Sequence, residues 1–347
     1  MSGIASNRIR LGIVGLGRVW ETRHKPALTR MKDRFQVTAV YDQVARRAEI
    51  EANAIGARAL DGLTALVEQP NVDAVAILAP QWFGSQPIEL AARSGKPVYC
   101  GLPLVDDLEG LDRLARLVNA SGIAFMSEFA PRFYPATIRL RELLGSTLGR
   151  PRAIVGTIRL IEADRNEPPG PGSQVVPGPL LVDPGQSLMD WARFVVGAEL
   201  GSTQVWTESG GPAHADEDQV GIIAHLASGA SARFVVERYQ KSLWGDADRF
   251  LPRPGIQVLC DRGAAFLEWP DLIHWTDGST NHQERIPSTN SLGETLFDQF
   301  ERMIRGEEHS APTWADALSA ASSLAAFGFE GRTEPGPEDE PSSPGKS

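Results

Sequence analysis

The stretch "LGIVGLGRVW" (residues 11–20) joins the end of an apolar run to two glycines in G-x-G spacing. We expect Ile9–Val14 to form a strand and a helix to begin after Gly17. In such a strand–turn–helix, Gly15 permits the tight turn, and Gly17 lets a pyrophosphate approach the backbone at the helix N-terminus. Trp20 stands where a third glycine would allow close packing. We therefore expect the helix to sit further out or the turn to be reshaped.

An acidic residue, Asp42, follows the second expected strand, Phe35–Tyr41. It lies somewhat further from Gly15 than the usual ~20 residues. A carboxylate here accepts a hydrogen bond from the adenosine ribose and repels a 2′-phosphate, which favours NAD over NADP. Arg46 and Arg47 leave NADP open, because a nearby arginine can hold the extra phosphate. The alternative is a doubly wound sheet whose turn binds nothing.

The chain changes character about one third of the way along. Short apolar runs first alternate with helical patterns, which indicates a parallel sheet with helices on both faces. After Phe129 the pattern indicates a mostly antiparallel sheet with accompanying helices. The sequence therefore predicts an α/β protein with three regions. These are a dinucleotide-binding domain over residues 1–130, an α+β domain over 131–330 and a disordered tail over 331–347.

The composition excludes several classes of function. With a net charge of −10 and no basic stripe, we expect no nucleic-acid partner. The two cysteines and six histidines show no metal-ligand spacing, so we expect no metal. No apolar stretch reaches membrane-spanning length, and the start of the chain lacks a signal-peptide core. We therefore expect a cytoplasmic protein without a membrane partner.

Segments spread over residues 8–332 carry a resemblance to a known family. They are "GIVGLG" (12–17), "HKPAL" (24–28, with one extra residue before it), "VDAVAILAP" (72–80), "SGKPV" (94–98), "RFYPA" (132–136), "DPGQSLMD" (183–190) and "DRGAAFLE" (261–268). In their order and spacing the chain resembles the glucose–fructose oxidoreductase/inositol dehydrogenase (Gfo/Idh/MocA) family. The resemblance implies a Rossmann domain with a parallel sheet, then an α+β domain with an open, mostly antiparallel sheet.

The same resemblance implies a function and partners. Members mostly oxidise or reduce sugars, cyclitols and their derivatives with NAD(P), so we expect a sugar- or polyol-like ligand. The open sheet often forms the oligomer interface in this family, so we expect a homo-oligomer. The expected cofactor is NAD, with NADP possible. By this resemblance the cofactor-binding residues are Gly15, Gly17, Arg18, Val19, Asp42 and Pro80.

Both proton-handling residues of the family are missing from their motifs. The family's catalytic lysine lies in Glu-Lys-Pro, where this chain reads Gly101-Leu102-Pro103. Its assisting histidine lies in D-x-G-x-H-x-x-D, where this chain has Ser187. Oxidation of an alcohol by hydride transfer requires removal of the hydroxyl proton, and a positioned acid or base supplies roughly 10²–10⁴-fold of that rate. Hydride transfer is therefore in doubt.

Four other residues are candidates for the missing chemistry. Lys241, in "ERYQKSLW", could reach the site from the second domain. Asp183 and Asp190 share a helix face with Ser187, although an aspartate followed by proline is also a good helix cap. Glu128 follows the sixth expected strand and could act as an acid or base if its pKa were raised. A solvated carboxylate is the alternative for Glu128.

Three further residues have two interpretations each. The family's Pro-Asn-x-x-His turn becomes "PQWFG" at residues 80–84, where Trp82 and Phe83 either line the ligand pocket or belong to the core. His24 matches the family's helix-start histidine, with packing or function as its role.

Two functional hypotheses follow. The first is an oxidoreductase with a rearranged acid or base. The second is a non-catalytic regulator or partner protein that binds a dinucleotide or a sugar-like ligand, as a yeast galactose-pathway repressor of this family does. An interaction module without a small ligand is a third possibility.

Overall fold

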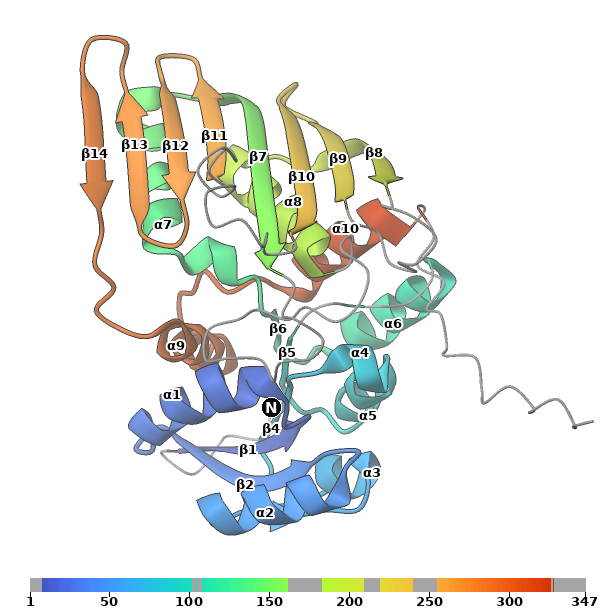
Figure 1. Cartoon of the computed structure of the whole chain (residues 1–347). Coiled ribbons are helices and arrows are strands. Elements are labelled where there is room, and N and C mark those ends of the chain that lie inside the picture. Colours follow the sequence, from blue (N-terminus) through green and yellow to red (C-terminus); the bar gives the residue numbers. More distant parts are fainter. Residues whose placement is uncertain are drawn as a thin grey trace, which may run out of the picture.

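The computed structural model describes residues 8–101, 104, 108–161, 183–208, 219–239, 255–325 and 327. Its first half is built on a six-stranded parallel sheet in the order β3-β2-β1-β4-β5-β6 (Figure 1). The strands are β1 (Ile9–Val14), β2 (Phe35–Tyr41), β3 (Arg58–Ala59), β4 (Ala74–Ile77), β5 (Val98–Cys100) and β6 (Phe125–Ser127). The strand order reverses between β1 and β4. In open α/β sheets, ligands bind at the carboxyl ends of the strands beside such a point.

Helices cover both faces of this sheet. They are η1 (Trp20–His24), α1 (Lys25–Arg30), α2 (Ala45–Ile55), α3 (Leu63–Val67), α4 (Pro80–Phe83), α5 (Gln86–Arg93) and α6 (Leu108–Ser121). The period-two alternation of the strands separates two hydrophobic clusters. On β1, Ile9, Leu11 and Ile13 join the cluster that contains Trp20, whereas Val14 joins the other.

The second sheet has eight strands in the order β14-β13-β12-β11-β7-β10-β9-β8. They are β7 (Pro151–Ile161), β8 (Leu200–Glu208), β9 (Gln219–Leu226), β10 (Ser231–Tyr239), β11 (Gly255–Cys260), β12 (Ala264–Glu268), β13 (Leu272–Thr276) and β14 (Asn281–Arg285). Among the described strands of this sheet, only β7 and β10 pair in parallel. The expected α/β fold, with a parallel sheet followed by an open, mostly antiparallel one, is therefore confirmed.

Helices lie on one face of the second sheet. The segment that joins the two sheets contains η2 (Ala130–Phe133), α7 (Pro135–Leu143) and η3 (Leu144–Leu148). A further helix, α8 (Asp183–Val196), follows β7. Figure 1 shows α7 and α8 behind the sheet. Within the described part of the chain, no helix covers the opposite face. Along β10, buried Ala232, Phe234 and Val236 alternate with more exposed residues, as expected of a sheet covered on one side.

The last two helices return to the first half of the molecule. In α9 (Leu292–Arg305), Phe297 and Phe300 join the hydrophobic cluster of β1, and Figure 1 shows this helix beside α1. The next helix, α10 (Trp314–Ala325), packs against α8 and α6.

The expected division at residues 130/131 stays a prediction, and the expected tail, 331–347, lies outside the described residues. The described helices include none with the length and apolarity needed to cross a membrane.

Candidate functional site

The glycine turn after β1 has the backbone geometry expected for a dinucleotide-binding turn. Gly15 has φ +89°, a region that side chains disfavour, and its N–H donates to the Tyr41 carbonyl at 2.9 Å. A Cβ added at Gly15 would lie 2.9 Å from the Cβ of Ala79. At Gly17, an added Cβ would meet no described atom within 4 Å. The first glycine is therefore required by the turn, and the second leaves space for a close approach to the backbone.

Trp20 does not occupy this turn. Its side chain is buried in the hydrophobic cluster of β1, together with Leu16 and Leu28. The helix widens at Trp20–His24 into a π-turn, in which the N–H of Lys25 donates to the Trp20 carbonyl. A π-turn accommodates one additional residue within a helix. It accounts for the extra residue before "HKPAL", so the helix changes shape while the glycine turn keeps its geometry.

Asp42 holds the glycine turn in place. One carboxylate oxygen accepts from the Leu16 N–H at 2.8 Å, and the other accepts from the Val44 N–H at 2.9 Å. Arg47 Nη1 donates to the same carboxylate at 3.2 Å. Asp42 therefore ties the end of β2 to the turn after β1. Its expected contact with a ribose hydroxyl stays a prediction, as does the choice between NAD and NADP.

A buried guanidinium nitrogen without a described partner lies at the start of the following helix. Arg18 Nη1 is buried and has no hydrogen-bond partner among the described residues. A buried guanidinium nitrogen without a partner is costly, and a phosphate oxygen is a strong acceptor for it. The site thus fits a diphosphate. Of the other expected cofactor residues, Val19 is exposed in the same helix, and Pro80 is buried at the start of α4.

Glu128 is paired rather than solvated. It follows β6, and its carboxylate contacts His24 Nε2 at 3.0 Å, the Tyr99 hydroxyl at 2.8 Å and Arg23. Burial alone would raise the pKa of Glu128, but His24, Arg23 and Tyr99 outweigh it and hold the pKa at about 2. A general acid at neutral pH needs the opposite shift. The contacts therefore favour a structural role, in which Glu128 links η1 to β5.

Glu128 should also make the fold sensitive to acid. Its folded-state pKa of about 2 lies below the ordinary glutamate value of 4.5, so its stabilisation is present above pH ~4.5 and is lost as the pH falls towards 2. The loss should be on the order of 3 kcal/mol. Denaturant unfolding between pH 7 and 3 should therefore show a flatter pH dependence for Glu128→Gln than for the wild type. The control Glu142→Gln, at an exposed ion pair, should follow the wild type; equal profiles for all three proteins would contradict the prediction.

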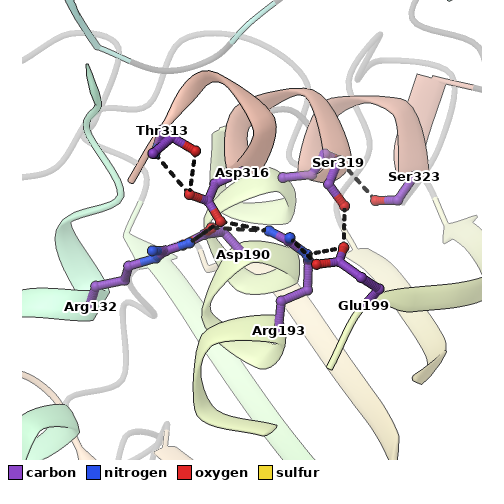
Figure 2. A network of polar contacts seen from close by, with 9 residues as sticks. Arg132, Asp190, Arg193, Glu199, Thr313, Asp316, Ser319 and Ser323 are labelled. Carbon is purple, nitrogen blue, oxygen red and sulfur yellow. Dashed lines mark hydrogen bonds and ion pairs between the residues drawn. The ribbon is translucent and has the colours of Figure 1, made fainter. Parts of the chain in front are cut away.

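Asp190 lies in a buried ion-pair network between α8 and α10 (Figure 2). Arg132 Nε donates to Asp190 Oδ2 at 2.7 Å, and Arg132 Nη2 contacts Asp190 Oδ1 and also Asp316 at 2.9 Å. Arg193 Nη1 lies 3.8 Å from Asp190 and 3.1 Å from Asp316. Burial raises the pKa of Asp190 to about 6, against the opposing effect of Arg132. Asp190 is thus a paired anion at neutral pH, and Thr313 completes the network by donating to Asp316.

The remaining acid/base candidates cannot be placed. Lys241 and the side chain of Asp183 lie outside the described residues, as does Leu102. Ser187 is half-buried on α8. In the described part of the chain, no cluster of three or more His, Cys, Asp or Glu residues could hold a metal ion.

The comparisons with known proteins agree with this geometry. Residues 9–129 match the family model GFO_IDH_MocA, described as an oxidoreductase family with an NAD-binding Rossmann fold. Residues 9–129 of this chain belong to the Gfo/Idh/MocA family. The expected family is thereby confirmed, and a nicotinamide dinucleotide is confirmed as the cofactor class of the matched family fold.

Three relatives illustrate the similarity. The chain is 26% identical over 268 residues to an inositol 2-dehydrogenase of Rhizobium meliloti, a match that covers 75% of this chain and 76% of that one. It is 28% identical over 200 residues to a dTDP-3,4-didehydro-2,6-dideoxy-alpha-D-glucose 3-reductase of Actinomadura kijaniata, covering 56% of this chain and only 58% of the reductase. A crystal structure of a 3-ketoreductase from Actinomadura kijaniata, in complex with NADP, superposes with a TM-score of 0.72 at 20% identity. The match covers 92% of this chain and 96% of the ketoreductase. That last likeness shows the fold.

One contact between α8 and the segment after β5 is not evident from the sequence. The side-chain amide of Gln186, next to Ser187, donates to the Leu104 carbonyl at 2.7 Å and accepts from the Leu104 N–H at 3.1 Å. Because Leu104 follows Gly101-Leu102-Pro103, Gln186 ties α8 to the segment after β5, where the resemblance places the family's lysine. Gly101 itself is confined, since an added Cβ would lie 3.3 Å from the Ile77 carbonyl oxygen.

Proposed function

We propose that this chain binds a nicotinamide dinucleotide at the Gly15–Gly17 turn, beside a sugar- or cyclitol-like ligand, and that hydride transfer between them is slow. The observation that carries the binding is the unpartnered Nη1 of Arg18 beside a turn whose glycine geometry is fixed by Asp42. The helix N-terminus and the guanidinium both favour a diphosphate at this position. The relatives named for inositol and for a dTDP-linked sugar support the ligand class.

The residues that remain support slow chemistry. A bound nicotinamide would supply or accept the hydride, while the protein must move the hydroxyl proton. Leu102 and Ser187 stand at the two proton-handling positions. Two of the four candidates for the missing chemistry, Glu128 and Asp190, are engaged in ion pairs. We therefore favour binding, and sensing of a ligand, over rapid turnover.

Two measurements test this function. Saturating NAD⁺, NADH or NADP⁺ should stabilise the protein by RT ln(1 + [L]/Kd), or about 2.7 kcal/mol at 100 times the Kd, in a thermal unfolding assay. Absorbance at the reduced-nicotinamide band, followed over a panel of inositols, aldoses and ketoses, should show little turnover. No stabilisation by any dinucleotide would contradict binding. Rapid turnover lost in Lys241→Met would instead show an oxidoreductase with a rearranged base.

We also propose that the uncovered face of the second sheet pairs with another copy of the chain. Val155, Trp206 and Leu259 are exposed, and the strand registers place all three on that face. Exposed apolar side chains gathered on one face mark an interaction surface. Sedimentation equilibrium tests the pairing, and a monomer at all concentrations would contradict it.

A further inference from the structure

Trp82 is an unusually exposed aromatic residue beside the glycine turn. Its side chain is 62% exposed, the largest exposed fraction among the exposed large hydrophobic residues of the described chain. It lies on α4, which follows β4, at the carboxyl ends of the strands and beside the point between β1 and β4 where the strand order reverses. Large apolar groups left in water at such an edge commonly mark a binding surface.

The position of Trp82 is fixed by its neighbours. The next residue, Phe83, packs against Tyr41 with ring centroids 5.8 Å apart, and its Cε2 would lie 3.4 Å from a Cβ on Gly15. On the other side, Gln43 Nε2 donates to the Trp82 carbonyl at 2.9 Å. Helix α4 is therefore held between the glycine turn and the residue that follows Asp42.

The order of groups along a bound dinucleotide indicates what Trp82 would meet. The pyrophosphate lies at the helix start near Gly17, and the adenosine ribose lies at the acidic residue that ends the second strand. The adenine therefore continues past Asp42, towards Gln43 and Val44. Val44 is itself 50% exposed, so two apolar side chains flank this end of the site.

We propose that Trp82 stacks on the adenine ring of the dinucleotide, with Val44 as a second apolar contact. The inference rests on the proposed dinucleotide binding and adds a specificity-determining residue to it. An indole offers a flat apolar face, and a base stacked on an aromatic side chain gains affinity with little dependence on hydrogen bonding. Stacking would also explain why the aromatic side chain is left in water.

Binding of dinucleotide fragments tests the stacking. By calorimetry, Trp82→Ala should weaken NAD⁺ and ADP-ribose by the same factor, roughly 5- to 100-fold. It should leave nicotinamide mononucleotide unchanged, because that half carries no adenine. Trp82→Phe keeps an aromatic face and should bind ADP-ribose almost as well as the wild type. Phe327→Ala is the matched control, since Phe327 is also an exposed aromatic residue, at 40%, and follows α10, away from the glycine turn.

Each outcome has a distinct meaning. Wild-type affinity of Trp82→Ala for ADP-ribose would overturn the stacking and leave dinucleotide binding intact. The stacking would also be overturned if Trp82→Ala weakened nicotinamide mononucleotide but not ADP-ribose. Trp82 would then contact the nicotinamide half of the dinucleotide. A wild-type protein that binds none of the three molecules would overturn both this inference and the proposed function.

Discussion

Replacing Arg132 by methionine should lower the free energy of unfolding by about 3–5 kcal/mol. The substitution leaves Asp190 fully buried with only Arg193, at 3.8 Å, to offset its charge. Removal of one partner from a buried ion pair is costly because the other charge stays desolvated. Methionine keeps apolar contact with Phe194, over which the guanidinium lies at 4.8 Å. Denaturant unfolding at neutral pH measures the loss.

The pH dependence of this variant separates a charge effect from lost packing. Without Arg132, the pKa of Asp190 should rise further above about 6. A carboxyl whose pKa is raised by folding contributes stability at low pH that is lost as the pH rises through the folded-state pKa. The deficit of Arg132→Met should therefore be smaller at about pH 5 than at about pH 8.

A matched arginine provides the control. Arg139 also binds a carboxylate through two nitrogens, Nε and Nη2 to Glu284, but this pair is partly exposed. Arg139→Met should cost no more than about 1 kcal/mol. If the two variants lost the same free energy of unfolding, with the same pH dependence, burial would not make the Arg132–Asp190 pair more important for stability than the Arg139–Glu284 pair.

Replacing Gly15 by alanine should lower the affinity for a nicotinamide dinucleotide about 100-fold. At φ +89°, alanine costs about 1–2 kcal/mol of backbone strain. Its Cβ would also lie 2.9 Å from that of Ala79, so the turn must move. Loss of two charge-assisted hydrogen bonds to the pyrophosphate, at about 1.5 kcal/mol each, gives the expected change. Calorimetric titration with NAD⁺ measures it.

Gly56 controls for strain alone. It ends α2 with φ +71°, and an added Cβ would meet no described atom within 4 Å. Gly56→Ala should therefore lose a similar 1–2 kcal/mol of stability while it keeps the wild-type affinity for NAD⁺. Equal affinities of Gly15→Ala and the wild type would show that the dinucleotide, if bound, does not use this turn.

Much of the dinucleotide turn could be predicted from local sequence. An apolar run followed by G-x-G, with an aspartate at the end of the next strand, indicates the turn because glycine geometry and strand periodicity are properties of short segments. The additional residue before "HKPAL" was visible too, and it corresponds to the π-turn at Trp20–His24. The burial of Trp20 was not predictable, since it depends on residues of β1 and α1 that pack around it.

The acid/base candidates show the limit of this reasoning. Glu128 and Asp190 were identified by position, but their protonation depends on partners far along the chain. Glu128 pairs with Arg23 and His24, more than 100 residues earlier, and Asp190 pairs with Arg132 from η2. Arg132 stood in the quoted segment "RFYPA" and His24 in "HKPAL". Charged or titratable residues within such apolar segments are a signal that could have suggested buried pairs.

The sequence by itself determined the order of strands and helices, the glycine turn and the residues Leu102 and Ser187, because these follow from residue identity and short-range periodicity. Only the tertiary structure decided that the two candidate carboxylates, Glu128 and Asp190, are paired with arginines, and that Trp82 is left exposed beside Gln43. Desolvation and ion pairing depend on which atoms surround a group in space, and those atoms come from segments that no local pattern connects.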